Sequence, residues 1–310
     1  MTKTVTILDC DFGRGEVEKE VLEPLGFSVR LGRAVSESDV LDLAVGSIGL
    51  LTQYASVGRA VFTTYPEVRA VVRYGVGVEC IDAVAAKEFG IRVSGVSDYC
   101  NDEVADHAFA LLLTALRSTH VSDREIKNDG WPNPSKLPMM GTLRGLTLGL
   151  LGFGRIAREV SSRAKAFGCR VIAYDPYVNE VTMNLFGVER VSLEEALSAS
   201  IISLHLPAND ETNKMIDANA LSLMPRGAII LNVSRGAIIN EADLLDSLDA
   251  GHIAYACLDV FEHEGPGSKL AKHHRVIASA HSGFYSPRAL EELRRRAAIN
   301  LANLLKEAHA

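Results

Sequence analysis

The sequence lacks several features that define large classes of protein. No apolar run reaches the roughly 18 residues that a membrane-spanning helix needs, so we expect no transmembrane segment. Basic residues are not in excess, because 32 Lys and Arg stand against 39 Asp and Glu, giving a net charge of −7. Sequence-independent nucleic-acid binding needs a high density of positive charge, so we expect no nucleic-acid partner. The first residues have no signal-peptide core.

Cysteine is sparse and follows no pattern. The five cysteines form no C-x-x-C pair, and their number is odd; they are Cys10, Cys80, Cys100, Cys169 and Cys257. This argues against a disulfide framework and against a cysteine zinc site. We interpret each as a reduced thiol that behaves as a small buried hydrophobic residue, and we expect a cytoplasmic protein.

The composition that is present is that of a globular protein. Apolar residues make up 47% and charged residues 23% of the 310 residues, which excludes a disordered chain and a fibre. At about 150 residues per domain, the length predicts two domains.

Short apolar stretches alternate with helical patterns in two blocks. The strand-like stretches are 4–9, 27–31, 47–51, 69–75 and 91–96, then 147–152, 169–175, 201–207, 227–234, 252–260 and 275–280. Such alternation is typical of βαβ units in parallel sheets. The sequence therefore predicts an α/β fold with two doubly wound parallel-sheet domains.

Longer helical patterns lie at the junctions of these blocks. One covers 101–120, and an irregular segment with three prolines, 129–145, follows it. The last helix is expected from about 286 to 308, with the basic run 294–296 on its solvated side. A basic run on a helix could also be a nucleic-acid patch, but a charged helix face is the stronger interpretation.

A glycine turn opens the second block. Gly152, Gly154 and Ala157 form G-x-G-x-x-A between a predicted strand and a predicted helix. The first glycine permits the tight turn, the second lets backbone N–H groups approach a pyrophosphate, and the small third residue lets helix and strand pack closely. The pattern alone is weak, because glycine turns are common between strands and helices.

The following strand strengthens this interpretation, because it ends at an acid. Asp175 lies 21 residues after Gly154, where a carboxylate can accept hydrogen bonds from both ribose hydroxyls of an adenosine. A 2′-phosphate would meet this negative charge, so NAD (NADH) is favoured over its phosphorylated form. The alternative is that Asp175 is a turn residue before Pro176.

Three polar residues follow predicted strands of the second block. They are Arg235, Glu264 and His281, and the carboxyl ends of such strands are where open α/β sheets bind ligands. Reduction of a 2-oxo acid by hydride needs a cation for the carboxylate, an acid for the developing alkoxide and a carboxylate that supports that acid. Arginine, histidine and glutamate fit these three tasks.

Each of these residues also has a structural explanation on its own. Arginine in a turn, glutamate beside glycine and histidine after a strand are common at protein surfaces. Glu262, His263 and Glu264, with His273 and His274, could instead bind a metal, but no strict ligand spacing supports it, and we expect none.

Together these motifs resemble the D-isomer-specific 2-hydroxyacid dehydrogenases, a phosphoglycerate dehydrogenase-like family. The resemblance covers nearly the whole chain. It rests on RYGVGVECID (73–82), LRGLTLGLLGFGRIARE (143–159), YDPY (174–177), SLHLPANDETNKMI (203–216), LMPRGAIILNVSRGAIINEADL (223–244), CLDVFEHEGP (257–266) and AHSGFYS (280–286). Within the family, the segments around 73–77, 98–113 and 281–286 are most similar to the C-terminal-binding-protein-like branch.

The resemblance implies roles for the matching positions. Arg235 would bind substrate, and His281 would be the acid/base residue, assisted by Glu264. The backbone N–H groups of Val76 and Gly77, with Arg235 and His281, would bind the substrate. The cofactor would contact Gly152, Gly154, Arg155, Ile156, Asp175, Pro207, Thr212, Val233, Asp259 and Gly283.

The resemblance also implies an organisation and an activity. Residues 1–98 and 286–310 would form a flavodoxin-like substrate domain into which a Rossmann NAD-binding domain, residues 99–285, is inserted. The segment from about Asn101 would support a homodimer. The implied activity is NAD-dependent interconversion of a 2-oxo acid and a (2R)-2-hydroxy acid. The alternative is an NAD(H)-sensing, corepressor-like interaction module.

The chain departs from the family around the pocket. Gly265 and Pro266 replace the proline that commonly follows Glu264, and the loop to His274 is short. Ser282 and Gly283 follow His281. Substrate choice is therefore open, including whether Tyr54 or Arg73 binds a second anionic group or serves the fold.

Overall fold

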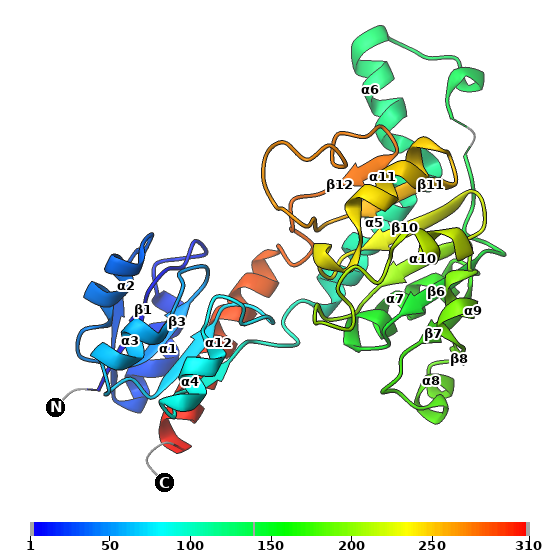
Figure 1. Ribbon diagram of the computed structural model, residues 1–310. Coiled ribbons are helices and arrows are strands. Elements are labelled where there is room, and N and C mark those ends of the chain that lie inside the picture. The colour runs from blue at the N-terminus through cyan, green and yellow to red at the C-terminus, as the bar shows by residue number, and fades with distance from the viewer. Residues whose placement is uncertain (1–2, 139, 308–310) are drawn as a thin grey trace. The chain divides into compact units, whose positions relative to one another are not determined.

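The computed structural model describes residues 3–138 and 140–307. Its contacts divide the chain into two compact units, Met1–Tyr99 with Tyr285–Ala310, and Cys100–Phe284. Each unit has its own parallel sheet and its own core. Figure 1 shows both.

The first unit is built on five parallel strands in the order β2-β1-β3-β4-β5. Its strands are β1 (Lys3–Ile7), β2 (Phe27–Leu31), β3 (Ser47–Thr52), β4 (Ala70–Arg73) and β5 (Arg92–Ser94). Its helices are α1 (Glu16–Leu22), η1 (Glu23–Leu25), α2 (Glu37–Ala44), α3 (Arg59–Thr64), α4 (Ala83–Glu88) and α12 (Pro287–Glu307). This strand order is the flavodoxin-like one.

Helix α12 comes from the far end of the chain, yet it packs against β3, β4 and α1 (Figure 1). The expectation that residues 294–296 all face solvent is wrong for Arg294, which is only 7% exposed. Its Nε and Nη2 atoms donate to the two carboxylate oxygens of Glu18, at 3.0 and 2.8 Å, and Glu18 is fully buried on α1. A buried ion pair therefore joins α12 to α1. Periodicity could not reveal it, because the partner lies 276 residues away.

The second unit carries seven parallel strands in the order β12-β11-β10-β9-β6-β7-β8. They are β6 (Thr147–Leu151), β7 (Arg170–Tyr174), β8 (Glu189–Arg190), β9 (Ile201–Leu204), β10 (Ala228–Asn232), β11 (Ile253–Leu258) and β12 (Val276–Ala278). From β8 to β11 this is the Rossmann order, with the switch point between β6 and β9. The predicted pair of doubly wound parallel sheets is confirmed.

The second unit also contains helices. They are α5 (Asn101–Arg117), α6 (Thr119–Asp129), η2 (Pro134–Lys136), α7 (Arg155–Ala166), α8 (Glu180–Leu185), α9 (Leu193–Leu197), α10 (Ala218–Leu223), η3 (Gly236–Ile238) and α11 (Glu241–Asp249). The single helix predicted over 101–120 is broken at Ser118, whose φ is +48°. The sequence analysis did not predict α8, because only Met183 is buried there and the helix has no repeating apolar face.

Two further expectations concern the thiols and the membrane. All five cysteines are free; Cys100, Cys169 and Cys257 are buried, whereas Cys10 and Cys80 are only half-buried, so the expectation of full burial is wrong for these two. Within the part of the chain that the structure describes, no helix combines the length and the apolar character needed to cross a membrane.

Candidate active site

The glycine turn sits at the switch point of the second sheet, between β6 and α7. Gly152 has φ +90°, and a Cβ there would lie 2.6 Å from the carbonyl oxygen of His205, so the fold itself requires glycine. A Cβ on Gly154 would meet no atom within 4 Å. The second glycine is therefore not needed for packing, and it leaves open space in front of the backbone.

That open space faces the start of a twelve-residue helix. Gly154 is the N-cap of α7, and no side chain caps its first turn. The first N–H groups of a helix have no partner within the helix and attract anions. Arg155 opens this turn, Ile156 packs on the core, and Ala157 is completely buried. The arrangement fits a pyrophosphate, as the motif predicts.

Asp175 lies beside this turn, at the end of β7. Its Oδ2 accepts a hydrogen bond from the Phe153 backbone N–H at 2.8 Å, and its Oδ1 accepts one from the Tyr177 N–H at 2.8 Å. A carboxylate oxygen has two lone pairs, so both oxygens keep capacity for further donors. The side chain is thus fixed against the glycine turn, where adenosine ribose hydroxyls would be read.

The loop after β9 forms the other side of the switch point. Thr212 Oγ1 donates to the Pro207 carbonyl oxygen at 2.6 Å, which ties two predicted cofactor residues together. His205, which the sequence analysis did not single out, lies 2.8 Å through Nε2 from Ser203 Oγ. Desolvation lowers the pKa of His205 to about 4, so its imidazole is neutral at pH 7. Its position directly after an apolar strand was the available signal.

Arg235 follows β10 and is held through its backbone. The buried Asn232 donates from Nδ2 to the Arg235 carbonyl oxygen at 2.8 Å and accepts through Oδ1 from both N and Oγ of Ser234. The guanidinium donates to the Ser234 carbonyl oxygen at 2.8 Å and is half-buried. Val233, in the same turn, packs on the core beneath. Asn232 was a further missed residue, visible as the only polar side chain in the stretch 228–232.

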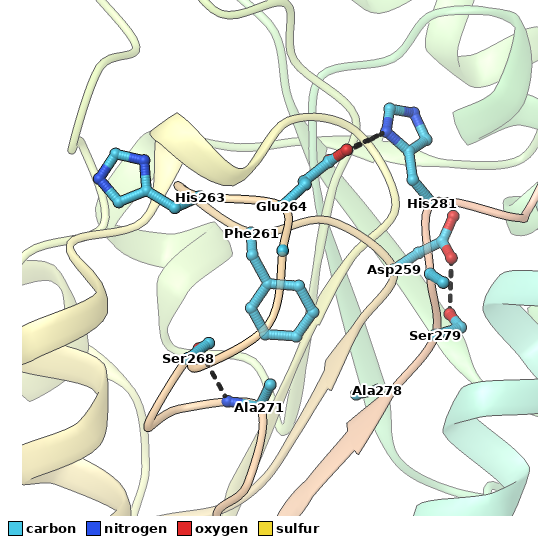
Figure 2. A pocket seen from close by; sticks show the side chains of 11 residues that line it. Asp259, Phe261, His263, Glu264, Ser268, Ala271, Ala278, Ser279 and His281 are labelled. Atoms are coloured by element: carbon cyan, nitrogen blue, oxygen red, sulfur yellow. Dashed lines mark hydrogen bonds and ion pairs between the residues drawn. The ribbon is translucent and has the colours of Figure 1, made fainter.

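Glu264 and His281 lie together. Figure 2 shows the Glu264 carboxylate pointing at the imidazole ring, and both carboxylate oxygens lie within 3.0 Å of His281 Nδ1. A carboxylate can only accept, so Nδ1 carries the hydrogen and Nε2 is left for another partner. The two side chains are partly exposed, at 48% and 43%. The structure thus joins two of the three residues that the sequence analysis grouped.

His281 is presented by an unusual backbone. Its φ is +50°, a left-handed conformation that costs a residue with a side chain roughly 1–3 kcal/mol. Its N–H donates to the Asp259 carbonyl oxygen at 2.8 Å. The surrounding hydrogen bonds therefore have to hold this conformation.

Asp259, at the end of β11, supplies those hydrogen bonds. Its side chain is 3% exposed and accepts from Ser279 Oγ at 2.6 Å and from the Ser282 and Gly283 N–H groups at 2.9 Å. Burial raises the pKa of this carboxyl, but hydrogen bonds from His107, Ser279 and the two amides outweigh it and bring the pKa below its ordinary value. Asp259 is therefore charged at pH 7.

The loops carrying Arg235 and Glu264 touch directly. A Cβ on Gly236 would lie 2.0 Å from the Phe261 carbonyl group and 2.5 Å from the Glu262 N–H. Strands β10, β11 and β12 are adjacent and parallel, so their carboxyl ends share one edge of the sheet. Arg235, Glu264 and His281 therefore all lie in segments at that edge. Beside the Glu264–His281 pair lies a cavity of about 460 Å³, lined also by Phe261, Ser268 and Ala278 (Figure 2).

Val76 and Gly77 belong to the first unit, in the loop after β4. Among the described residues, no acceptor is bonded to either backbone N–H, and Val76 is 58% exposed. Arg73 holds this loop: it donates through Nε to the Gln53 carbonyl oxygen at 3.1 Å and through Nη1 to that of Gly77 at 3.4 Å. These bonds favour the structural interpretation of Arg73. Tyr54 is exposed and lines a separate cleft at the ends of β1, β2 and β3.

The residues considered for a metal site are placed as follows. Across the described ranges, no group of three or more His, Cys, Asp or Glu side chains is placed to hold an ion. The His273 ring instead lies beside that of His274, with centroids 4.5 Å apart and the ring planes tilted by 36°, and its Nε2 lies 3.2 Å from Asp249 Oδ1.

Comparison with known proteins finds a matching family model. Residues 109–283 match the family model described as D-isomer specific 2-hydroxyacid dehydrogenase, NAD binding domain. The D-3-phosphoglycerate dehydrogenase 3, chloroplastic, of Arabidopsis thaliana is 39% identical over 239 residues, which are 76% of this chain and 40% of that protein. The glyoxylate reductase of Korarchaeum cryptofilum is 37% identical over 259 residues, or 82% of this chain and 77% of that one.

A solved structure resembles the chain over its whole length. The glyoxylate reductase from Paecilomyes thermophila has a TM-score of 0.89 and 27% identity, covering 99% of this chain and 97% of that one. The chain spans less than half the length of the phosphoglycerate dehydrogenases it matches. The second unit is thus an NAD-binding domain, and the chain belongs to the D-isomer specific 2-hydroxyacid dehydrogenase family.

Proposed function

We propose that the protein is an NAD-dependent oxidoreductase that interconverts a 2-oxo acid and a (2R)-2-hydroxy acid. The observation that carries this proposal is the Glu264–His281 pair, with both carboxylate oxygens within 3.0 Å of Nδ1, at the same sheet edge as Arg235. In this proposal residues 99–285, which contain the second unit, bind the cofactor, and residues 1–98 with 286–310 bind the substrate.

In the proposed mechanism His281 moves the proton. Glu264 holds Nδ1–H and stabilises the imidazolium, so Nε2 is the atom that donates to the substrate oxygen in reduction and accepts from the hydroxyl in oxidation. When bound, NADH supplies the hydride that reaches the substrate carbon. Because the pair is partly exposed, His281 can exchange its proton with solvent between turnovers.

Arg235 and the first unit would hold the substrate. A guanidinium offers paired N–H donors, which suit a carboxylate and its neighbouring oxo group. The N–H groups of Val76 and Gly77, which have no backbone acceptor among the described residues, would offer further donors of the kind that successive backbone amides provide. We assign both to the substrate carboxylate, with His281 at the reacting oxygen.

We assign the remaining predicted positions to the cofactor site. Asp175 would accept from the ribose hydroxyls, and the uncapped start of α7 with Gly152, Gly154, Arg155 and Ile156 would hold the pyrophosphate. Pro207, Thr212, Val233, Asp259 and Gly283 follow the carboxyl ends of neighbouring strands and would contact the rest of the cofactor.

We also propose a homodimer formed through α5 and the segment after it. Trp131, the only tryptophan, is 89% exposed just beyond α6, and Ile126 on α6 is 42% exposed. Large exposed apolar side chains are typical of interfaces. The five free thiols support a reducing compartment, and we place the protein in the cytoplasm.

The test is NADH consumption with a panel of 2-oxo acids, including glyoxylate, pyruvate, hydroxypyruvate and phosphorylated acids. We expect turnover with at least one acid, a (2R) product from any acid whose reduction creates a stereocentre at C2, and loss of turnover in Arg235→Gln. Tight NADH binding without turnover of any acid would contradict the proposal and favour an NAD(H)-sensing interaction module.

A further inference from the structure

His107 forms a hydrogen-bonded cluster with Asp259 and Ser279 directly beneath the segment that carries His281. It lies on α5, which packs against β11 and β12 from a distant part of the chain. Its Nε2 is 2.8 Å from Ser279 Oγ and 3.2 Å from Asp259 Oδ1. The Ser279 hydroxyl donates to Asp259 Oδ1 at 2.6 Å.

The chemistry of the cluster defines which atom donates. Because the Ser279 hydrogen is engaged with Asp259, its oxygen is left as an acceptor, and the Asp259 carboxylate only accepts. His107 must therefore carry a hydrogen on Nε2, shared between these two oxygens. A charge-assisted bond of this kind is stronger than a neutral one.

The Asp259 carboxylate forms hydrogen bonds with residues on both sides of His281. The Asp259 carboxylate accepts hydrogen bonds from the hydroxyl of Ser279, which precedes His281, and from the N–H groups of Ser282 and Gly283, which follow it. The backbone carbonyl oxygen of Asp259 accepts the hydrogen bond from the His281 N–H. A Cβ on Gly283 would lie 3.0 Å from Asp259 Oδ2 and 3.4 Å from His107 Cδ2, so His107 also closes off this turn sterically.

We propose that His107 is a positioning residue for His281, acting through Ser279 and Asp259; this rests on the proposed function of His281 as the acid/base. The left-handed conformation at His281 is maintained only while Asp259 stays in place. Ser279, Ser282 and Gly283 are close to Asp259 in the sequence, whereas His107 reaches the same carboxylate from α5. It thereby ties the acid/base turn to α5.

The test compares His107→Ala with His107→Gln, whose amide nitrogen can take the place of Nε2. We expect kcat for the best acid of the panel to fall about 10–100-fold in His107→Ala, because misplacement by about 1 Å costs on the order of 10²-fold. KM for the acid should change less than about twofold, and His107→Gln should recover most of kcat. His252→Ala is the matched control, since it loses one hydrogen bond, to the Leu221 carbonyl oxygen, elsewhere in the same unit.

A second measurement does not depend on turnover. Imidazole signals of ¹⁵N-histidine-labelled protein, with His281 assigned by its absence in His281→Gln, should show His281 shifted in His107→Ala and unshifted in His252→Ala. Wild-type kcat with an unmoved His281 signal in His107→Ala would overturn the proposal, and so would a raised KM at unchanged kcat. If the wild type reduces no acid, the proposed function fails, and the His281 signal alone decides whether His107 positions that residue.

Discussion

Replacing Arg294 by methionine should destabilise the first unit strongly. The change removes the two bonds to Glu18, at 3.0 and 2.8 Å, and one from Nη1 to the Phe12 carbonyl oxygen at 3.3 Å. Glu18 is fully buried and would keep only the hydrogen bond from the Tyr74 hydroxyl, at 2.9 Å. Breaking a buried ion pair by removing one partner costs about 3–5 kcal/mol.

The neighbouring residue provides a matched control. Arg295 lies on the same helix but is partly exposed, with Glu20 and Glu291 at 3.3 and 3.2 Å. Arg295→Met removes the same charge and a similar length of side chain. Solvent screens the exposed pairs, so this variant should be nearly as stable as the wild type.

A double variant separates the loss of the Arg294–Glu18 ion pair from the cost of leaving the Glu18 carboxylate buried without a partner. Glu18→Gln neutralises the buried carboxylate and keeps an oxygen for the Tyr74 hydroxyl. Glu18→Gln with Arg294→Met should therefore be more stable than Arg294→Met alone, because most of the cost of the single change is a buried charge without its partner.

Urea unfolding followed by circular dichroism measures these differences. The expected order of midpoints is wild type and Arg295→Met highest, the double variant between, and Arg294→Met lowest. Equal midpoints for Arg294→Met and Arg295→Met would refute the argument, and so would a double variant less stable than the single one.

Three further outcomes follow from the second unit. His281→Ala should lower kcat by about 10²–10⁴ with NADH affinity little changed, as for other lost general acids; near-normal turnover would refute its role. Asp175→Ala should weaken NADH binding and reduce the preference for NADH over NADPH, measured by titration of both cofactors. An unchanged ratio of the two affinities would mean that another residue recognises the ribose. His205 has its pKa lowered to about 4, so the unfolded chain binds more protons between pH 6.5 and 4. The contribution of His205 to stability is present above pH 6.5 and is lost as the pH falls towards 4. As the pH is lowered across this range, the unfolding midpoint of His205→Gln should therefore fall less steeply than that of the wild type. Midpoints of the two proteins that fall in parallel would contradict this.

The local chemistry of the cofactor turn could be read from residue order. Gly152, Gly154 and Asp175 could be proposed as cofactor residues because a parallel strand, a tight turn and a helix follow one another along the chain. The same logic placed Arg235, Glu264 and His281 at the ends of three strands, because carboxyl ends of parallel strands share one edge of a sheet.

Long-range partners could not be read in this way. Arg294 is buried because α1 supplies Glu18 from the other end of the sequence, and a helical pattern says which residues share a face, not what covers it. His107 lies in a helix whose pattern shows only its apolar side, and its bonds to Ser279 and Asp259 exist because α5 packs on the strands that carry them.

The sequence by itself determined the fold class, the glycine turn and the grouping of Glu264 with His281, since these depend on side-chain types and on neighbours along the chain. Only the tertiary structure decided that the imidazole of His281 faces Glu264 from a left-handed backbone, and that buried charges fix the surrounding elements. Those features depend on distances between segments far apart in the sequence, and periodicity carries no information about such distances.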